Sequence, residues 1–283
     1  REFLHVDDLA DACVHLLRHY SGELQLNAPV DRIVTRGGLA TGLAFADGSE
    51  RPFDQVGSNA DVHHTYARLL RDDPRGRQAG EALARRRWSM SLFVAYFGLK
   101  RRHEQLRNHT ILFGPRYKGL ISEIFRGPDV PDDFSLYLHA PTRTDPALAP
   151  EGCEAFYVLS PVPHLGACDV DWSVEGPKYR DRIFDYLEHR AIPGLREDLV
   201  TSRIFTPKDF ETELNSHLGS AFSLEPILTQ SAWFRVHNRD DKISNLYFVG
   251  AGSHPGAGVP GVVGSAKATA GLMIEDARLR AAA

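Results

Sequence analysis

Apolar and polar residues alternate along the chain in a way that predicts strands interspersed with helices. Apolar runs typical of strands occur at residues 39–46, 91–99, 135–140, 154–160, 200–205 and 246–249. Helical spacing predicts helices at 62–70, at 75–88, after Pro177 and from residue 261 onward, and Thr206-Pro207 marks a further helix start. The pattern therefore predicts a mixed α/β (α+β) fold.

The order of these elements also predicts how the chain is divided. Residues 1–22 form a segment of their own, and residues 23–60 form part of one sheet domain that includes a β-hairpin. Residues 61–240 form a long mixed block, after which residues 241–283 return to the first domain. We expect a long block inserted between two pieces of one nucleotide-binding domain.

One segment, Asn245 to Met273, combines features of a ligand-binding turn. A short apolar run leads into six glycines between Gly250 and Gly264, and helical spacing follows. Such a turn lets a ligand approach the backbone, and the helix start offers free N–H groups. The alternative is a tight strand-to-helix turn whose glycines serve packing alone.

Composition excludes several classes of protein. The chain has 283 residues, of which 42% are apolar and 25% charged, as in a globular protein, and its net charge of −4 argues against nucleic-acid binding. Three separated cysteines give no disulfide framework and no metal site. Two basic clusters, at 85–87 and 100–102, are either solvated surface or contacts to anionic lipid headgroups.

Several strings resemble one family. SNADVHHTY, YVLSPVPHLG, LTQSAWFRVHNRD and NLYFVGAGSHPGAGVPGVVGSAKATAGLM are similar, in the same order, to bacterial phytoene desaturases. The resemblance runs from about Glu23 to the end of the chain. It implies an amine-oxidase-like flavoprotein with an FAD-binding Rossmann-like domain, here incomplete, and an inserted substrate domain of antiparallel sheet plus helices.

The resemblance also implies the chemistry. Such enzymes use FAD to desaturate the apolar C40 polyene phytoene towards lycopene. The residues implied at the cofactor lie in the glycine-rich segment: Gly250, Ala251, Gly252, Val259, Pro260, Gly261 and Val262. Because the substrate resides in lipid, we expect a cytoplasmic protein held peripherally on the inner face of the cell membrane.

Flavin chemistry needs few protein groups beyond cofactor binding, substrate alignment and a proton acceptor. Three polar residues are candidates for proton transfer: His139, His164 and Glu225. For His164, which lies among turn residues, the alternative is a loop residue hydrogen-bonded to the backbone. No metal is expected.

The N-terminal segment departs from this family. REFLHVDDLADAC is similar to nucleotide-sugar epimerases and GDP-fucose synthase, and we interpret residues 1–22 as a fusion scar or misjoined end. The strand, G-x-G-x-x-G turn and helix that hold the FAD pyrophosphate do not precede Glu23. We therefore expect an N-terminally truncated chain that, when alone, binds FAD weakly or not at all; the alternative is a non-catalytic remnant that binds carotenoid or membrane.

Overall fold

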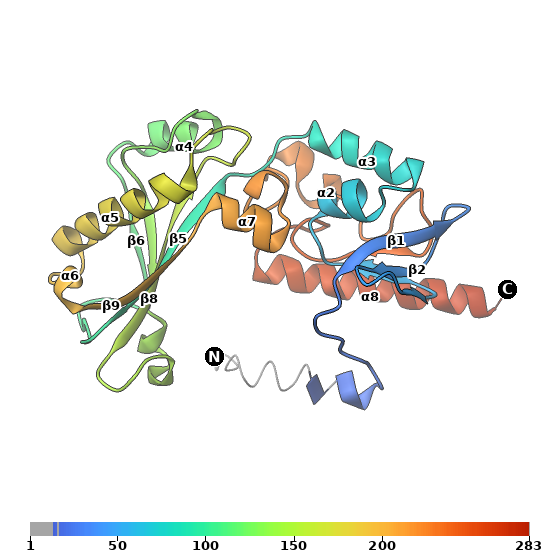
Figure 1. Cartoon of the computed structure of the whole chain (residues 1–283), viewed down its shortest axis with the longest axis horizontal. Helices are drawn as coiled ribbons and strands as arrows, with labels where there is room; N and C mark the ends of the chain where they lie inside the picture. The colour runs from blue at the N-terminus through green and yellow to red at the C-terminus, as the bar shows by residue number, and fades with distance from the viewer. Residues whose placement is uncertain (1–13, 16, 283) are drawn as a thin grey trace.

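The computed structural model describes residues 14, 15 and 17–282. Most of the epimerase-like segment, including its predicted strand, lies outside the described residues. Two hydrophobic core clusters organise the rest, one around a large antiparallel sheet and one around a small parallel sheet. Figure 1 shows the two parts side by side, with strand β5 running between them.

The larger part is a five-stranded antiparallel sheet with the order β6-β7-β8-β5-β9. Its strands are β5 (Ser91–Leu99), β6 (His109–Leu112), β7 (Leu136–His139), β8 (Glu154–Val162) and β9 (Leu199–Phe205). Four of these strands confirm the apolar runs in the sequence. Strand β6 and helix α4 (Tyr117–Arg126) were not predicted.

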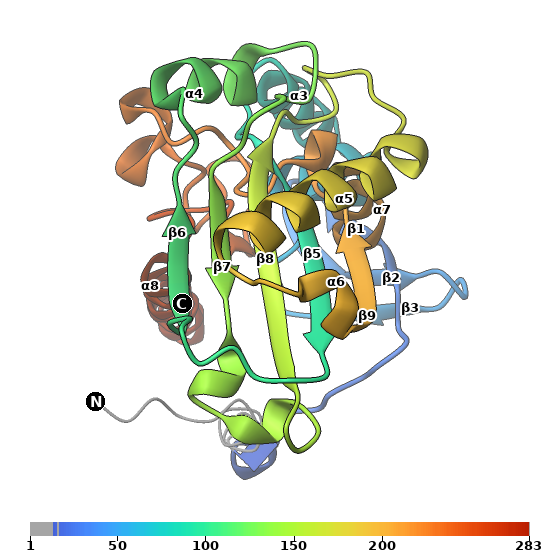
Figure 2. The same ribbon diagram turned by 90° about the vertical axis from the view of Figure 1, so that its left-hand side faces the viewer.

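Helix α5 (Trp172–Arg190) covers one face of this sheet (Figure 2). Its residues Tyr179, Ile183 and Leu187 recur every fourth position and are fully buried, and burying side chains of this size contributes about 1.5–3 kcal/mol each. The prediction that Pro177 opens this helix is wrong. The start is set by Asp171, whose carboxylate accepts the Ser173 N–H at 2.9 Å.

Two short helices flank the last strand of the sheet. Helix α6 (Leu195–Asp198) precedes β9, and helix α7 (Pro207–Leu214) follows it. The predicted start of α7 is confirmed, because Thr206 and Asp209 form a reciprocal capping box. This cap ends the sheet and directs the chain back towards the smaller part.

The smaller part contains two sheets and several helices. Strands β1 (Val30–Arg36), β2 (Leu39–Phe45) and β3 (Glu50–Pro52) form an antiparallel meander, and β4 (Val56–Ser58) pairs in parallel with β10 (Leu246–Phe248). The helices are α2 (Val62–His64), the π-helical turn η1 (Thr65–Leu69), α3 (Pro74–Ala84) and α8 (Val259–Ala281). The predicted hairpin is confirmed, and Asp61 caps α2 at the start of the helix predicted from residue 62.

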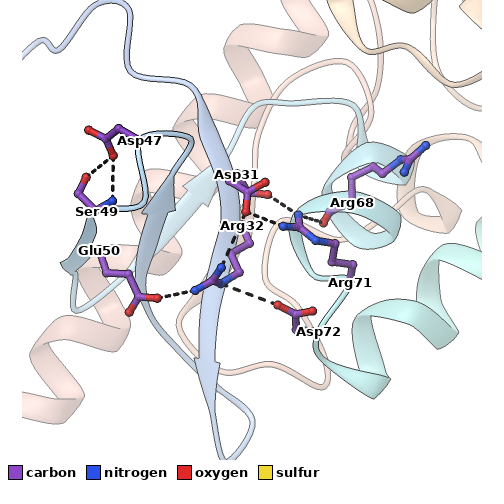
Figure 3. A network of polar contacts seen from close by, with 8 residues as sticks. All are labelled: Asp31, Arg32, Asp47, Ser49, Glu50, Arg68, Arg71 and Asp72. Atoms are coloured by element: carbon purple, nitrogen blue, oxygen red, sulfur yellow. Dashed lines mark hydrogen bonds and ion pairs between the residues drawn. The ribbon is translucent and has the colours of Figure 1, made fainter.

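Ion pairs tie the meander to η1 and to the turn after it (Figure 3). Arg71 Nη2 contacts Asp31 Oδ2 at 2.5 Å, and Arg71 Nη1 donates to the Asp31 carbonyl at 2.6 Å. Arg32 pairs with Glu50 at 2.5 Å. Exposed pairs of this kind contribute little individually; the Arg71–Asp31 pair links β1 to the turn after η1, and the Arg32–Glu50 pair links β1 to β3.

The predicted domain boundary at residue 61 is not a packing boundary. Val62, Leu70 and Leu83 belong to the same core cluster as β4 and β10. Trp88 and Leu224 also belong to it, so the chain leaves the small part just before β5 and re-enters it near residue 218. Among the described residues, no helix has the length and apolar character needed to cross a bilayer.

Candidate functional site

The glycine-rich segment joins β10 to α8, and buried hydroxyl groups fix it to the helix. Ser265 Oγ accepts the Gly250 N–H at 3.1 Å and lies 2.9 Å from Ser253 Oγ. Asn238 Nδ2 donates to Ser265 Oγ and Thr269 Oγ1, each at 3.0 Å. The small-residue face of α8 is therefore its inward face, and its buried polar atoms are paired with one another.

The glycines of this turn serve two different purposes. A Cβ at Gly250 would collide with Asn59, and one at Gly252 would collide with Val62. These two glycines let the turn pack onto the end of β4 and the start of α2. Gly258 differs, because it has φ +93 and a Cβ there would meet no atom within 4 Å. The space in front of Gly258 is open to a ligand.

The first turn of α8 has the character of a site for a flat, partly polar ring. Val259 is 78% exposed, Pro260 is also exposed, and the leading N–H groups of a helix have no partner within it. Figure 1 shows this end of α8 directed towards the five-stranded sheet, with its carboxyl end pointing away. In Figure 2, α8 lies on the opposite side of the sheet from α5. The helix start thus offers an exposed apolar side chain beside free N–H donors.

A further feature of this turn was missed in the sequence. Gly256, Gly258 and Gly261 have the G-x-G-x-x-G spacing of a dinucleotide-binding loop and lie at the start of α8. In that motif the strand leads directly into the first glycine, whereas here Val249–Pro255 intervene. The spacing alone therefore does not assign a pyrophosphate site.

Two of the three proton-transfer candidates lie together. His164 and Glu225 line one cavity of about 340 Å³ between the two parts, beside Arg87 and Trp88. Glu225 is committed to an ion pair with Arg87 at 2.5 Å. His164 Nδ1 accepts the Gly166 N–H at 3.1 Å, so the neutral ring carries its proton on Nε2 and has no free lone pair.

Burial lowers the pKa of His164, although nearby Glu225 opposes the shift. His164 is thus a neutral loop residue whose Nδ1 accepts a backbone N–H. This is the alternative to proton transfer that the sequence had left open. The geometry thus favours structural roles for both residues at this junction.

Beside His164 and Glu225 lies a cluster of His63, His217 and Trp88, which was not predicted from the sequence. The rings of His63 and His217 lie 3.7 Å apart, and Trp88 contacts His217 edge-on at 4.6 Å. Burial, together with the neighbouring His63 and His164, lowers the pKa of His217 to about 4. Trp88 is only 4% exposed, and its Nε1 has no hydrogen-bond partner. The one signal in the sequence is the His63-His64 pair that follows the Asp61 cap.

Asp61 connects this cluster to the glycine-rich turn. Its carboxylate accepts the backbone N–H groups of His63 at 2.9 Å and His64 at 3.1 Å, and burial raises its pKa to about 6. The next residue, Val62, fills the space in front of Gly252. This cluster is therefore joined to the turn through the short segment from Asp61 to His63.

The third candidate, His139, lies elsewhere, on the sheet face that α5 leaves uncovered. There the strand register aligns Tyr96 with Tyr157, Tyr157 with His139, and His139 with His109. The stacked rings of His109 and His139 are 4.7 Å apart, and burial lowers the pKa of His139. His139 is one member of an aromatic row that crosses four strands.

The basic clusters are partly used inside the protein. Lys100 and Arg101 both pair with the buried Asp198, and Arg87 pairs with Glu225. All six residues of the two clusters are nevertheless exposed, and Arg85, Arg86 and Arg102 form no ion pair with any residue that the structure describes. The lipid contact suggested by the sequence therefore stays a prediction. The part of the chain that the structure describes contains no group of His, Cys, Asp or Glu suited to a metal ion.

Comparison with known proteins identifies relatives over nearly the whole chain. A lycopene-forming phytoene desaturase of Pseudescherichia vulneris is 60% identical, and one of a Paracoccus species is 58% identical, each over 95% of this chain and 54% of the relative. A 4,4'-diapophytoene desaturase of Staphylococcus haemolyticus is 38% identical over 95% of this chain and 54% of the relative. No protein-family model matches. The chain is homologous to the phytoene desaturases and spans about half the length of these relatives.

Solved structures support the fold. An oxidoreductase of Methanosarcina mazei matches with a TM-score of 0.63 at 16% identity, over 94% of this chain and 53% of that protein. A putrescine oxidase variant matches with a TM-score of 0.58 at 14% identity, over 94% and 52%. At this identity the likeness shows a shared fold, and it agrees with the mixed α/β oxidoreductase architecture expected from the sequence.

Proposed function

We propose that this chain, homologous to the phytoene desaturases, provides the substrate sheet and a flavin-facing segment of an FAD-dependent enzyme that desaturates phytoene in carotenoid biosynthesis. One observation carries the proposal. The open start of α8 is directed towards the uncovered aromatic face of the five-stranded sheet (Figure 1). A flavin at the helix start and a polyene on the sheet would thus face each other.

In this function, Gly258 and the first turn of α8 hold the flavin ring. Gly258 admits the ring because it has no side chain, and Val259 supplies an apolar contact beside the free N–H groups. FAD, when bound, accepts hydride from the hydrocarbon. The residues that would contact it are those implied by the resemblance at the helix start, namely Val259, Pro260, Gly261 and Val262. Gly250 and Gly252 act indirectly, by seating the turn on β4 and α2.

The sheet aligns the substrate and excludes water from it. The uncovered face presents the cross-strand pairs Leu92–Pro161, Val94–Leu159 and Tyr96–Tyr157. A hydrocarbon placed on these pairs gains about 0.8 kcal/mol per buried CH₂. Each new double bond also releases a proton, and His139 on the aromatic row is the candidate acceptor that faces the substrate side.

The same function implies contact with lipid, because its substrate is a hydrocarbon. We place the protein at the inner face of the cell membrane, attached peripherally. The exposed Arg85, Arg86 and Arg102 are the residues of the two basic clusters that remain available for anionic headgroups.

The test has two steps. The purified chain is first mixed with excess FAD and desalted, and flavin absorbance is measured per polypeptide. Since no G-x-G-x-x-G turn directly follows a strand in this sequence, we expect only a small fraction to retain flavin; stoichiometric retention would contradict that expectation. The chain is then incubated with saturating FAD and phytoene-loaded liposomes, and coloured carotenes are followed by visible absorbance.

A non-catalytic carotenoid-binding role is the second candidate, favoured by the aromatic row, which can bind a polyene without any cofactor. Coloured product with added FAD supports the enzyme. Phytoene binding without conversion, even at saturating FAD, supports the binding module instead.

A further inference from the structure

The aromatic face of the sheet leads to an apolar cavity of about 540 Å³, here called the distal cavity. It lies at the end of the sheet away from the junction, between β5, β8, β9 and the loop that precedes β8. The side chains most relevant to its interior are those of Tyr96, Leu148, Cys153, Tyr157 and Val200.

The two charged residues that line the distal cavity, and the hydroxyl group of Tyr157, already have partners. Glu154 is buried and pairs with Arg143 at 2.8 Å, and Arg203 pairs with Glu213 at 3.6 Å. Burial and a hydrogen bond with Tyr137 raise the pKa of Tyr157 to about 12, so its hydroxyl stays neutral. A ligand here finds apolar surface and few free polar partners, which is the environment that a hydrocarbon prefers.

The residues of β5 that face away from α5 form an apolar track between the cavity and the junction. Strand β5 starts at Ser91, whose Oγ donates to the Gly219 carbonyl at 2.5 Å, and this track then carries Leu92, the buried Val94 and the partly exposed Tyr96. At about 3.3 Å per residue, Tyr96 lies about 17 Å along the strand from Ser91. A rod-shaped molecule that reacts near the junction would therefore extend along β5 and place one end in the distal cavity.

We infer that the distal cavity holds one end of the hydrocarbon substrate and selects its length. This inference rests on the proposed function for the identity of the substrate class. The cavity favours a hydrocarbon long enough to reach it, because each CH₂ buried there is removed from water, which stabilises the complex. A shorter hydrocarbon that ends on the track does not enter the cavity. Filling the cavity with a larger side chain should therefore leave the affinity for the shorter hydrocarbon unchanged.

The test fills the cavity with a larger side chain. Leu148→Trp does so from the preceding loop, and Val200→Trp does so from β9. The matched control is Leu214→Trp on α7, because Leu214 is exposed to a similar degree (53%, against 47% for Leu148) and does not line the cavity. Far-ultraviolet circular dichroism and urea unfolding establish that each variant folds like the parent chain.

Binding is measured with phytoene and with the shorter 4,4'-diapophytoene, each dispersed in detergent. The protein is separated by size exclusion, and co-eluting hydrocarbon is quantified by ultraviolet absorbance. We expect each cavity variant to bind phytoene about tenfold more weakly than the parent chain while its binding of 4,4'-diapophytoene changes by less than twofold. Leu214→Trp should match the parent for both.

Equal losses for the two hydrocarbons, unchanged phytoene binding in both cavity variants, or a parent chain that binds neither hydrocarbon would overturn the inference. Different results would refute the role of the distal cavity and the proposed desaturase activity. Length-selective binding without any conversion would refute the desaturase activity alone. Conversion that is insensitive to both cavity variants would refute the cavity's role alone.

Discussion

Arg235 holds the glycine-rich turn against the loop that precedes it, and replacing it tests how far the site depends on one buried charge. The residue is 4% exposed, and burial lowers the pKa of its guanidinium. Its donors reach four backbone carbonyls, those of Ala251 at 2.9 Å, Leu224 at 3.2 Å, Gln230 at 3.5 Å and Phe222 at 2.5 Å. Methionine retains most of the stem and removes every donor.

The size of the effect follows from opposing contributions. Hydrogen bonds from a charged group contribute about 1.5–3 kcal/mol each, so four of them give roughly 6–12 kcal/mol before any offset. Removing the buried charge recovers several kcal/mol of desolvation. We expect Arg235→Met to lower the free energy of unfolding by about 3–5 kcal/mol, a large fraction of an ordinary protein's stability.

Urea unfolding followed by circular dichroism measures this loss. The matched control is Arg239→Met, because Arg239 is exposed and pairs only with surface carboxylates of α8, Asp276 at 2.7 Å and Glu275 at 3.2 Å. Its loss should be about 0–1 kcal/mol. If Arg235→Met also loses less than 1 kcal/mol, the carbonyl cage does not stabilise the turn and the reasoning fails.

Three further changes test the junction, the core and the helix start. Because the pKa of His217 is about 4 when folded and 6.5 when unfolded, the unfolded chain binds more protons between these values and stability falls as pH drops through this window. His217→Gln should recover about 2 kcal/mol of that loss in urea unfolding at pH 4.5 and 7.5, and an unchanged pH profile would contradict it. Tyr179→Phe should cost about 1–3 kcal/mol, since it leaves the buried Ser160 hydroxyl, 2.7 Å away, without its partner. Adding Ser160→Ala should restore part of it, and additive losses would argue against a shared hydrogen bond. Gly258→Val should raise the flavin dissociation constant in a titration, whereas Gly48→Val, which places valine at a similarly open glycine of positive φ, should leave it unchanged; equal effects would remove Gly258 from the site.

The sequence by itself determined the elements whose signals are local. Strand β5 follows its apolar run from Ser91 to Leu99, and α7 begins at the Thr206-Pro207 cap as predicted. The strings similar to phytoene desaturases, now supported by homologues at 57–60% identity, came from the order of short motifs. Local signals succeed here because capping and strand burial depend on neighbouring residues.

Local sequence signals did not predict the start of α5, strand β6 or the way the first helices pack. The predicted start of α5 relied on Pro177 alone, whereas Asp171 caps the helix because its carboxylate accepts a free backbone N–H. Strand β6 was missed because its four residues, His109 to Leu112, are short and only partly apolar. The boundary at residue 61 was misplaced, since a change in pattern does not reveal which core a helix joins.

Only the tertiary structure decided what the candidate residues do. It brought His164 beside Glu225 and His63 beside His217, pairs far apart in the chain, and it placed His139 in a row defined by strand register. It also turned the small, polar Ser265 and Thr269 inward and left the start of α8 open towards the sheet. These outcomes depend on strand pairing and on burial against distant segments, and no local pattern of residues encodes either.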